Sequence, residues 1–226
     1  MSTDGSVRAR YDGVAEWYDA QLDSAPHRHA VLRRSLSSGT GPCLDVGCGT
    51  GRDLPVIEEF GWTAFGVELS TDQLRLARRR SVRVVQGDAE QLPFQSSTFP
   101  MAVSCWTSTD VDHFDRMLAE VARVLRPGGR FLFYGVHPCF NGPHVEGLSD
   151  RSRLVHPTYR DARRHTSAPW WGADGIRTKV GGMRHVPLAE FINAFIDAGL
   201  VLDRVAEPDE EPVPWAIVIS ASKSAR

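Results

Sequence analysis

The sequence predicts an α/β domain built on a mainly parallel sheet, and three observations support this prediction. Between residues 42 and 136, short apolar β-rich runs alternate with helical patterns, an order typical of βαβ units. The chain has 226 residues, which is enough for one domain with its own core and too short for two ordinary ones. Hydrophobic residues make up 42% of the chain and charged residues 24%, the balance of a soluble globular protein. We therefore expect a single domain over residues 1–226.

The first part of this pattern contains three strands and two helices. Ser70 and Gln73 form a capping box, in which the hydroxyl and the amide satisfy each other's backbone groups, and this marks the start of the second helix. The predicted elements are, in chain order, a strand at Pro42–Val46, a helix at Asp53–Phe60, a strand at Trp62–Val67, a helix from Ser70 to about Arg80 and a strand at Val82–Gln86.

The second part contains four strands and two helices. The apolar run that predicts the fourth strand is Phe99–Ser104, but Pro100 cannot donate a hydrogen bond to a neighbouring strand, so we expect pairing in this run to begin one residue after Phe99. The Pro-Gly-Gly sequence at 127–129 is expected to end one helix, and Gly199 the last one. The predicted elements are a strand at Phe99–Ser104, a helix at Phe114–Leu125, a strand at Arg130–Val136, a helix at Leu188–Ile196 after Pro187, and strands at Leu200–Val205 and Trp215–Ala221.

Two segments lie outside the alternating pattern. Residues 1–38 precede the first strand, and we expect them to be largely helical. Residues 137–186 connect the fifth strand to the last helix and are longer than the connections of compact domains. A connection of this length is typically functional or mobile.

Charge and hydropathy exclude several classes of protein. The net charge is −2, so we expect no nucleic-acid partner. The longest apolar runs, Phe131–Val136 and Trp215–Ser220, are far too short to cross a membrane, and the N-terminus lacks the apolar core of a signal peptide. The four cysteines contain no C-x-x-C pair, which argues against a disulfide framework and a zinc site. We expect a cytoplasmic protein with no metal and no membrane partner.

A glycine-rich turn follows the first predicted strand. Gly47, Gly49 and Gly51 let the backbone turn tightly and let a ligand approach it closely, and the next helix N-terminus attracts a negative group. Glu68 ends the second strand, 17 residues after Gly51. A carboxylate there can accept hydrogen bonds from both hydroxyls of a ribose. The pattern predicts a nucleoside-type ligand.

The spacing distinguishes between ligands of this type. Arg52 stands where the dinucleotide-binding fingerprint has its third glycine. Asp45 lies two residues before Gly47, and a carboxylate there favours a ligand with an amino group over a pyrophosphate.

Four motifs in order resemble those of class I S-adenosylmethionine-dependent methyltransferases, in their small-molecule (type 11-like) group. They are Leu44–Gly51 (LDVGCGTG), Gly66–Ser70 (GVELS), Gly87–Phe94 (GDAEQLPF) and Arg123–Gly129 (RVLRPGG). The resemblance covers about residues 8–136 and the last helix. It implies S-adenosyl-L-methionine as cofactor and a Rossmann-like seven-stranded sheet of order 3-2-1-4-5-7-6. Strand seven would be antiparallel, and residues 1–38, with Tyr11-Asp12 and Tyr18-Asp19, would form an N-terminal lid. We also expect helices on both faces of the sheet and a lid insertion at residues 137–186.

The resemblance also implies which residues contact the cofactor. They are Gly47, Cys48, Gly49 and Gly51 under the methionine moiety, Asp45 and the Ser104 carbonyl at its amino group, Glu68 at the ribose, Asp88, Ala89 and Leu69 at the adenine, and Tyr11 and Tyr18 over the sulfonium.

Each of these residue types also has a plain structural explanation. Glu68 and Asp88 could be solvated acids at strand ends. Asp45 could cap a helix. Tyr11 and Tyr18 are seven residues apart on one helical face and could belong to the core.

Two histidines are candidate general bases. His137 directly follows the fifth strand and His113 comes shortly after the fourth, at the sheet edge where this fold class binds its ligands. His137 could instead be a loop histidine bonded to the backbone. His113 lies beside Asp110 and Asp112, which could cap the next helix.

The 137–186 segment is rich in ring side chains, which predicts a lid over an aromatic or heterocyclic acceptor. The alternative is that its tryptophans pack the lid against the body. The residues expected to contact the acceptor are His137, Phe140, Trp170, Trp171 and His185.

The predicted activity is methyl transfer to a small-molecule acceptor by a monomer or homodimer. A protein that binds the cofactor without transferring a methyl group, such as a cyclase, would keep the same motifs. A protein or RNA methyltransferase is a further alternative, but Ser104-Cys105-Trp106-Thr107 stands where amino-methylating enzymes tend to have Asn/Asp-Pro-Pro-Tyr. The excess of arginine over lysine is typical of GC-rich genomes and is compatible with bacterial secondary metabolism.

Overall fold

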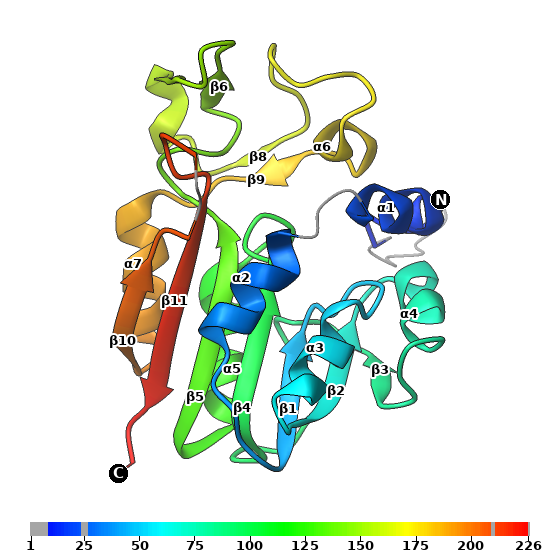
Figure 1. Cartoon of the computed structure of the whole chain (residues 1–226). Helices are drawn as coiled ribbons and strands as arrows, with labels where there is room; N and C mark the ends of the chain where they lie inside the picture. Colours follow the sequence, from blue (N-terminus) through cyan, green and yellow to red (C-terminus); the bar gives the residue numbers. More distant parts are fainter. Residues whose placement is uncertain (1–8, 24–26, 209–210, 226) are drawn as a thin grey trace, which may run out of the picture.

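A seven-stranded sheet forms the centre of the computed structural model, which describes residues 9–23, 27–208 and 211–225 (Figure 1). Parts of the predicted 1–38 helical segment therefore lie outside the described residues. The strands of this sheet are β1 (Pro42–Val46), β2 (Thr63–Glu68), β3 (Val84–Gln86), β4 (Phe99–Cys105), β5 (Leu125–Val136), β10 (Leu200–Ala206) and β11 (Ala216–Lys223).

The sheet confirms the predicted topology. Its order is β10-β11-β5-β4-β1-β2-β3, which corresponds to 3-2-1-4-5-7-6 when the seven strands are numbered along the chain. β11 runs antiparallel to both β5 and β10, and the other neighbours are parallel. In the central strand β1, Asp45 is paired with Gly66 of β2 and Val103 of β4. Asp45 is therefore held at the middle of the sheet, near its carboxyl edge.

Helices cover both faces of the sheet, and each face has its own apolar core. One core lies under α2 (His27–Ser35), α3 (Asp53–Glu59) and α4 (Thr71–Ala77). The other lies under α5 (Phe114–Val124) and α7 (Leu188–Asp197), where Phe114 stacks on Phe191 with ring centroids 5.1 Å apart. The Ser70 hydroxyl accepts the Gln73 N–H at 3.2 Å, so the predicted start of α4 is confirmed.

Two predicted boundaries are wrong, the later start of β4 and the start of β5 after the Pro-Gly-Gly sequence. β5 begins at Leu125 and includes the Pro-Gly-Gly sequence, and β4 begins at Phe99. Phe99 pairs with Leu125 and Met101 with Arg130, so four residues of β5 bulge opposite Pro100. The bulge accommodates the proline, which cannot donate to the ladder. Helix α5 ends because Leu125 is extended, not because glycine follows.

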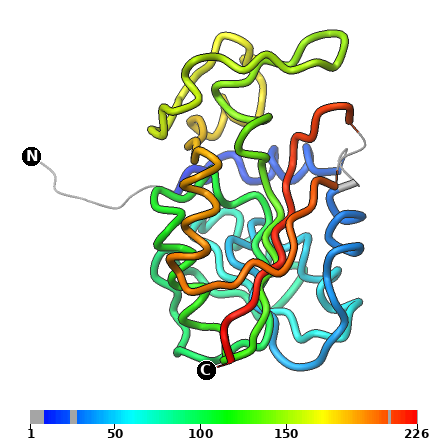
Figure 2. The backbone as a smooth tube through the Cα atoms, turned by 90° about the vertical axis from the view of Figure 1, so that its left-hand side faces the viewer, coloured from blue at the N-terminus to red at the C-terminus, as the bar shows by residue number. Residues whose placement is uncertain are grey.

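Residues 137–186, called the insertion below, extend beyond the carboxyl edge of the sheet (Figures 1 and 2). Helix α1 (Ala15–Leu22) lies at the same edge, near the short helix α6 of the insertion (Figure 1). Among the described residues, no helix is long and apolar enough to cross a membrane. The insertion contains β6 (Val145–Gly147), β7 (Arg153–Val155), η1 (Pro157–Arg160), β8 (Arg164–His165), α6 (Ile176–Lys179) and β9 (Met183–Arg184).

Candidate functional site

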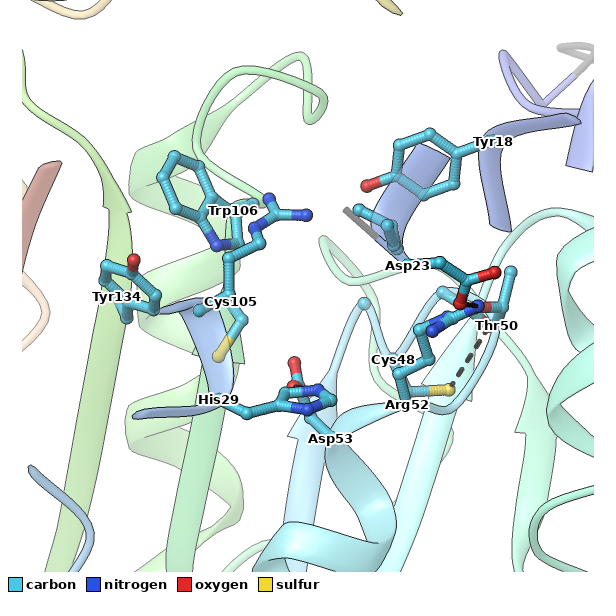
Figure 3. A pocket seen from close by; sticks show the side chains of 14 residues that line it. Tyr18, Asp23, His29, Cys48, Thr50, Arg52, Asp53, Cys105, Trp106 and Tyr134 are labelled. Atoms are coloured by element: carbon cyan, nitrogen blue, oxygen red, sulfur yellow. Dashed lines mark hydrogen bonds and ion pairs between the residues drawn. The ribbon is translucent and has the colours of Figure 1, made fainter. Parts of the chain in front are cut away.

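Two adjoining cavities open at the carboxyl edge of β1, β2 and β4. The larger has a volume of about 310 Å³ and the smaller about 220 Å³. Figure 3 shows the smaller one, into which side chains from α1, α3, β4 and β5 project. The residues that line both cavities, and so join them, are Tyr18, Gly47, Gly49, Cys105 and Trp106.

The glycine turn forms the floor between the two cavities. Gly47, Gly49 and Gly51 have φ values of +73°, +55° and +80°, a conformation that other residues rarely adopt. A Cβ on Gly47 would lie 2.4 Å from a methyl carbon of Thr107. Gly51 lines neither cavity and instead packs against Ala77 of α4, so its part is structural.

Glu68 joins the turn after β1 to the turn after β2. Its carboxylate accepts the Gly49 N–H at 3.0 Å and the Ser70 N–H at 2.8 Å, one on each oxygen. Burial raises the pKa of Glu68 to about 7, although the hydrogen bonds from Ser70 and Gly49 oppose that shift. Each oxygen keeps a second lone pair that can accept a hydrogen bond from a ligand hydroxyl.

Asp45 lies beneath this floor rather than in the lining of either cavity. It is 1% exposed, and neither carboxylate oxygen has a hydrogen-bond partner in the described part of the chain. Burial raises the pKa of Asp45, and the neighbouring carboxylates of Asp53 and Glu68 raise it further. When it is ionised, a buried carboxylate of this kind needs a cation or water beside it.

Eight of the twelve residues predicted to contact the cofactor line the larger cavity. Cys48 lines the smaller one, and Asp45, Gly51 and Ser104 line neither. The Ser104 hydroxyl donates to the Val46 carbonyl at 2.9 Å and so fixes β4 to β1. The eight residues are Tyr11, Tyr18, Gly47, Gly49, Glu68, Leu69, Asp88 and Ala89.

Residues 9–22, called the N-terminal lid below, are fastened to both turns. The Asp12 carboxylate accepts the Ser70 hydroxyl at 2.6 Å. The Asp19 carboxylate accepts hydrogen bonds from Thr50 at 2.5 Å, Arg52 at 2.7 Å and Arg80 at 2.9 Å. Burial alone would raise the pKa of Asp19, but these three donors hold it well below its usual value.

The predicted general base His137 does not reach either cavity. Its ring is 4% exposed and stacks on Phe140 with centroids 4.7 Å apart. One ring nitrogen accepts the Cys139 N–H at 3.1 Å, and the other lies 2.9 Å from a Glu207 carboxylate oxygen. Because both nitrogens are already bonded, this arrangement argues against the base role and for the alternative of a bonded loop histidine.

The other predicted acceptor contacts also lie outside both cavities. Trp170 stacks on His156 with centroids 4.1 Å apart, and Trp171 packs against the core on the α2 side. His185 is buried beside His144, and burial lowers its pKa to about 4. These rings pack within the insertion and against the body. This agrees with the alternative that the tryptophans pack the lid against the body.

His113 lies at the edge of the larger cavity, as predicted, and is exposed. The expected capping of α5 by Asp110 or Asp112 is wrong. His113 is itself the N-cap residue and makes no side-chain capping bond. A Glu90 carboxylate oxygen instead accepts the N–H groups of Asp112 at 2.8 Å and His113 at 2.7 Å.

Sequence reasoning missed Arg28 and Trp106. The Arg28 guanidinium lies 4.2 Å from the centre of the Trp106 ring and lines the smaller cavity. Trp106 has a φ of +65°, which is rare for a residue other than glycine and common at functional sites. The acids near Arg28 are already paired, Asp53 with His29 at 3.2 Å and Asp23 with Arg52 at 2.7 Å. No motif marks Arg28, and the conformation of Trp106 cannot be read from its residue type.

Comparison with known proteins agrees with this geometry. Residues 44–133 match the family model described as "Methyltransferase domain". The chain is 35% identical over 145 residues to the demethylmenaquinone methyltransferase of Symbiobacterium thermophilum, covering 56% of this chain and 57% of that protein. It is 38% identical over 109 residues to the fatty-acid O-methyltransferase of Mycolicibacterium smegmatis, covering 46% and 40%. The chain thus spans about half the length of these relatives.

Solved structures support the fold. A crystal structure of an S-adenosylmethionine-dependent methyltransferase from Mesorhizobium loti superposes with a TM-score of 0.70, at 22% identity, and covers 94% of this chain and 99% of that one. At this identity the likeness establishes the fold alone. Residues 44–133 thus match a methyltransferase domain, within a fold that S-adenosylmethionine-dependent methyltransferases share.

Proposed function

We propose that this protein transfers a methyl group from S-adenosyl-L-methionine to a small-molecule acceptor. The observation that carries the proposal is the pair Asp45 and Glu68. One is a buried carboxylate with no partner among the described residues, and the other offers free lone pairs directly above the glycine turn. A ligand that brings a cationic amine and a ribose would satisfy both.

We assign a residue of the chain to each part of this cofactor. Glu68 would accept the ribose hydroxyls, and Asp45 would compensate the α-amino group through the floor of the cavity. Arg28 would bind the carboxylate of the amino-acid end from the smaller cavity, since a guanidinium forms strong hydrogen bonds with carboxylates. The adenine contacts are assigned to Leu69, Asp88 and Ala89.

The cofactor, when bound, supplies an activated methyl group, so the chain has little covalent chemistry to perform. Its residues would exclude water and orient the acceptor along the line of the S–CH₃ bond. Tyr11 and Tyr18, whose rings lie edge to face at 4.8 Å, cover the larger cavity for this purpose. Of the two histidines considered as bases, His113 is the one that lines this cavity, and we assign to it any proton transfer that the acceptor requires.

We infer that the acceptor has an apolar, ring-containing body. Four aromatic residues line the two cavities, Tyr11, Tyr18, Trp106 and Tyr134, and such surfaces favour flat apolar ligands. The named substrates of the two relatives, a demethylmenaquinone and a fatty acid, are apolar small molecules as well. We also propose a role in bacterial secondary metabolism, with which the excess of arginine over lysine is compatible.

Two measurements test the proposal. Calorimetry should detect binding of S-adenosylhomocysteine, with Glu68→Ala weakening it at least about ten-fold through lost hydrogen bonds to a charged group. Conversion of S-adenosylmethionine to S-adenosylhomocysteine should then be followed with a panel of quinones, phenols and fatty acids. Binding without conversion by any acceptor would favour the alternative of a cofactor-binding protein, such as a cyclase. No binding at all would refute the proposal.

A further inference from the structure

A single carboxylate connects three distant parts of the chain above the larger cavity. Asp110 lies in the loop between β4 and α5 and lines that cavity. One of its oxygens accepts the Tyr11 hydroxyl at 3.0 Å, and the other lies 3.3 Å from the Arg177 guanidinium. Tyr11 belongs to the N-terminal lid, whereas Arg177 belongs to α6 of the insertion. The three side chains are called the latch below.

The backbone around Asp110 holds the same two segments. The Asp110 carbonyl accepts hydrogen bonds from Arg10 of the N-terminal lid at 3.2 Å and from Arg164 of the insertion at 3.0 Å. The Thr109 carbonyl accepts the Arg184 N–H of β9 at 2.9 Å. The loop after β4 is therefore a point on the body to which both segments are attached.

The latch is half-buried, since the side chains of Asp110 and Arg177 are each 23% exposed. Burial raises the pKa of Tyr11, and the Asp110 charge raises it further, so the tyrosine remains a neutral hydrogen-bond donor. Withdrawing either partner would remove a hydrogen bond from the Asp110 carboxylate in this half-buried site. Away from Asp110, the two segments also touch where the Lys179 ammonium lies 4.8 Å from the centre of the Trp17 ring.

We propose that Asp110 is a positioning residue that holds the N-terminal lid and the insertion closed over the cofactor together. This inference rests on the proposed function. The consequence is that enclosure of the cofactor and closure of the insertion over the acceptor are coupled. Residues of the insertion that do not line the cofactor cavity control how quickly the cofactor leaves, and the insertion is closed only when the cofactor is enclosed.

The test is the dissociation rate of S-adenosylhomocysteine, measured by stopped-flow displacement. Arg177 does not line the cofactor cavity, so Arg177→Met would leave that rate unchanged if the insertion closed independently. We expect Arg177→Met, like Tyr11→Phe, to accelerate dissociation at least about ten-fold, the loss expected for a hydrogen bond to a charged group. The double variant should dissociate no faster than the more affected single variant, because both changes open one latch.

Matched controls separate the latch from general damage to the insertion. Arg163→Met removes another insertion arginine, one whose side chain is 78% exposed and pairs with the nearby Asp161. It should leave the dissociation rate within about two-fold of wild type, since exposed pairs contribute little. Arg177→Lys, which keeps the charge, should restore part of the slow dissociation. Thermal unfolding of each variant shows that it is folded at the assay temperature.

The outcomes distinguish this inference from the proposed function. If wild-type protein binds S-adenosylhomocysteine but Arg177→Met leaves its dissociation unchanged, the shared latch is wrong and the proposed function stands. Additive effects of Tyr11→Phe and Arg177→Met would also overturn the latch. If wild-type protein does not bind S-adenosylhomocysteine, both proposals fail.

Discussion

Asp19 accepts a hydrogen bond from the Thr50 hydroxyl at 2.5 Å, which fastens the N-terminal lid to the turn that carries Gly47 and Gly49. The same carboxylate bonds to Arg52 and Arg80, so helix α1, the turn after β1 and the segment after α4 converge on one charge. The turn contains three glycines with positive φ and belongs to no helix or strand, so contacts from other segments hold it in place. Asp19 supplies that support.

Replacing Asp19 by Asn should therefore destabilise the protein at neutral pH. Asn keeps an oxygen for Thr50 but loses the charge that faces two arginines, and we expect a loss of about 1–2 kcal/mol in the free energy of unfolding. The lowered pKa means that this stabilisation is present above the unfolded value, about 3.9, and is lost as the pH falls below it. Urea titrations at pH 7 and at about pH 3 should show the difference between wild type and variant shrinking in acid.

Asp174→Asn is the control for this experiment. The Asp174 side chain is 97% exposed and lies 3.5 Å from Lys179, a geometry that contributes little to stability. An equal loss in both variants, or a difference at Asp19 that does not depend on pH, would contradict the assigned role.

Glu68 should give the opposite pH dependence. Its pKa is raised to about 7 in the folded state, against about 4.3 in an unfolded chain, so the folded state binds the proton more tightly. Its contribution to stability is present below pH 4 and is lost as the pH rises through 7. Relative to Glu68→Gln, the ligand-free wild type should lose up to about 3 kcal/mol over this interval, measured by chemical denaturation. Parallel curves for the two proteins would show that Glu68 does not titrate in this range.

Ligand binding should reverse the effect of pH at Glu68. Ribose hydroxyls donate hydrogen bonds, so they favour the ionised carboxylate. The affinity for S-adenosylhomocysteine should therefore rise from pH 6 to pH 8 in wild type, whereas Glu68→Gln should bind weakly with a flatter profile. Calorimetry at three pH values decides this point, and a steeper profile in the variant would be incompatible with the assignment.

Arg28 should matter only for ligands that carry the amino-acid end of the cofactor. Arg28→Met should weaken binding of S-adenosylhomocysteine at least about ten-fold by removing a charge-assisted hydrogen bond. It should leave 5′-methylthioadenosine, which lacks the carboxylate, within about two-fold. Arg33→Met is the matched control, because Arg33 lies on the same helix but pairs with Glu59 at 2.7 Å, outside both cavities. Equal losses for the two ligands would show that Arg28 supports the fold instead.

The sheet was predictable because its signals are local. Each strand before residue 105 is a short apolar run followed by a polar turn, and β1 was predicted with the bounds that the structure shows. The strand order came from the family resemblance, since runs of apolar residues do not say which strands are neighbours. The error at residues 125–129 has a tertiary origin. Leu125 pairs with Phe99 across the sheet, and this pairing overrides the preference of Pro-Gly-Gly for a turn.

The cofactor side of the site was more predictable than the acceptor side for a similar reason. Glu68 ends β2 and Asp88 comes shortly after β3, two strands whose ends are visible in the sequence, and both residues line the larger cavity. The insertion has no such periodicity, so the partner of each ring could not be read from its position. Trp170 meets His156, and His137 meets Glu207, 70 residues away. Contacts of this kind are decided by packing alone.

His137 provides the clearest test of that distinction. Its buried ring bonds to Cys139 and Glu207 and stacks on Phe140, so His137→Ala should lower the free energy of unfolding by about 2–3 kcal/mol. Because the ring lines neither cavity, the affinity for S-adenosylhomocysteine should stay within about two-fold. Glu207→Gln, which changes only the more exposed partner, should cost less stability. A stable His137→Ala protein whose methyl transfer is ten-fold slower would instead restore the general-base role that the sequence suggested.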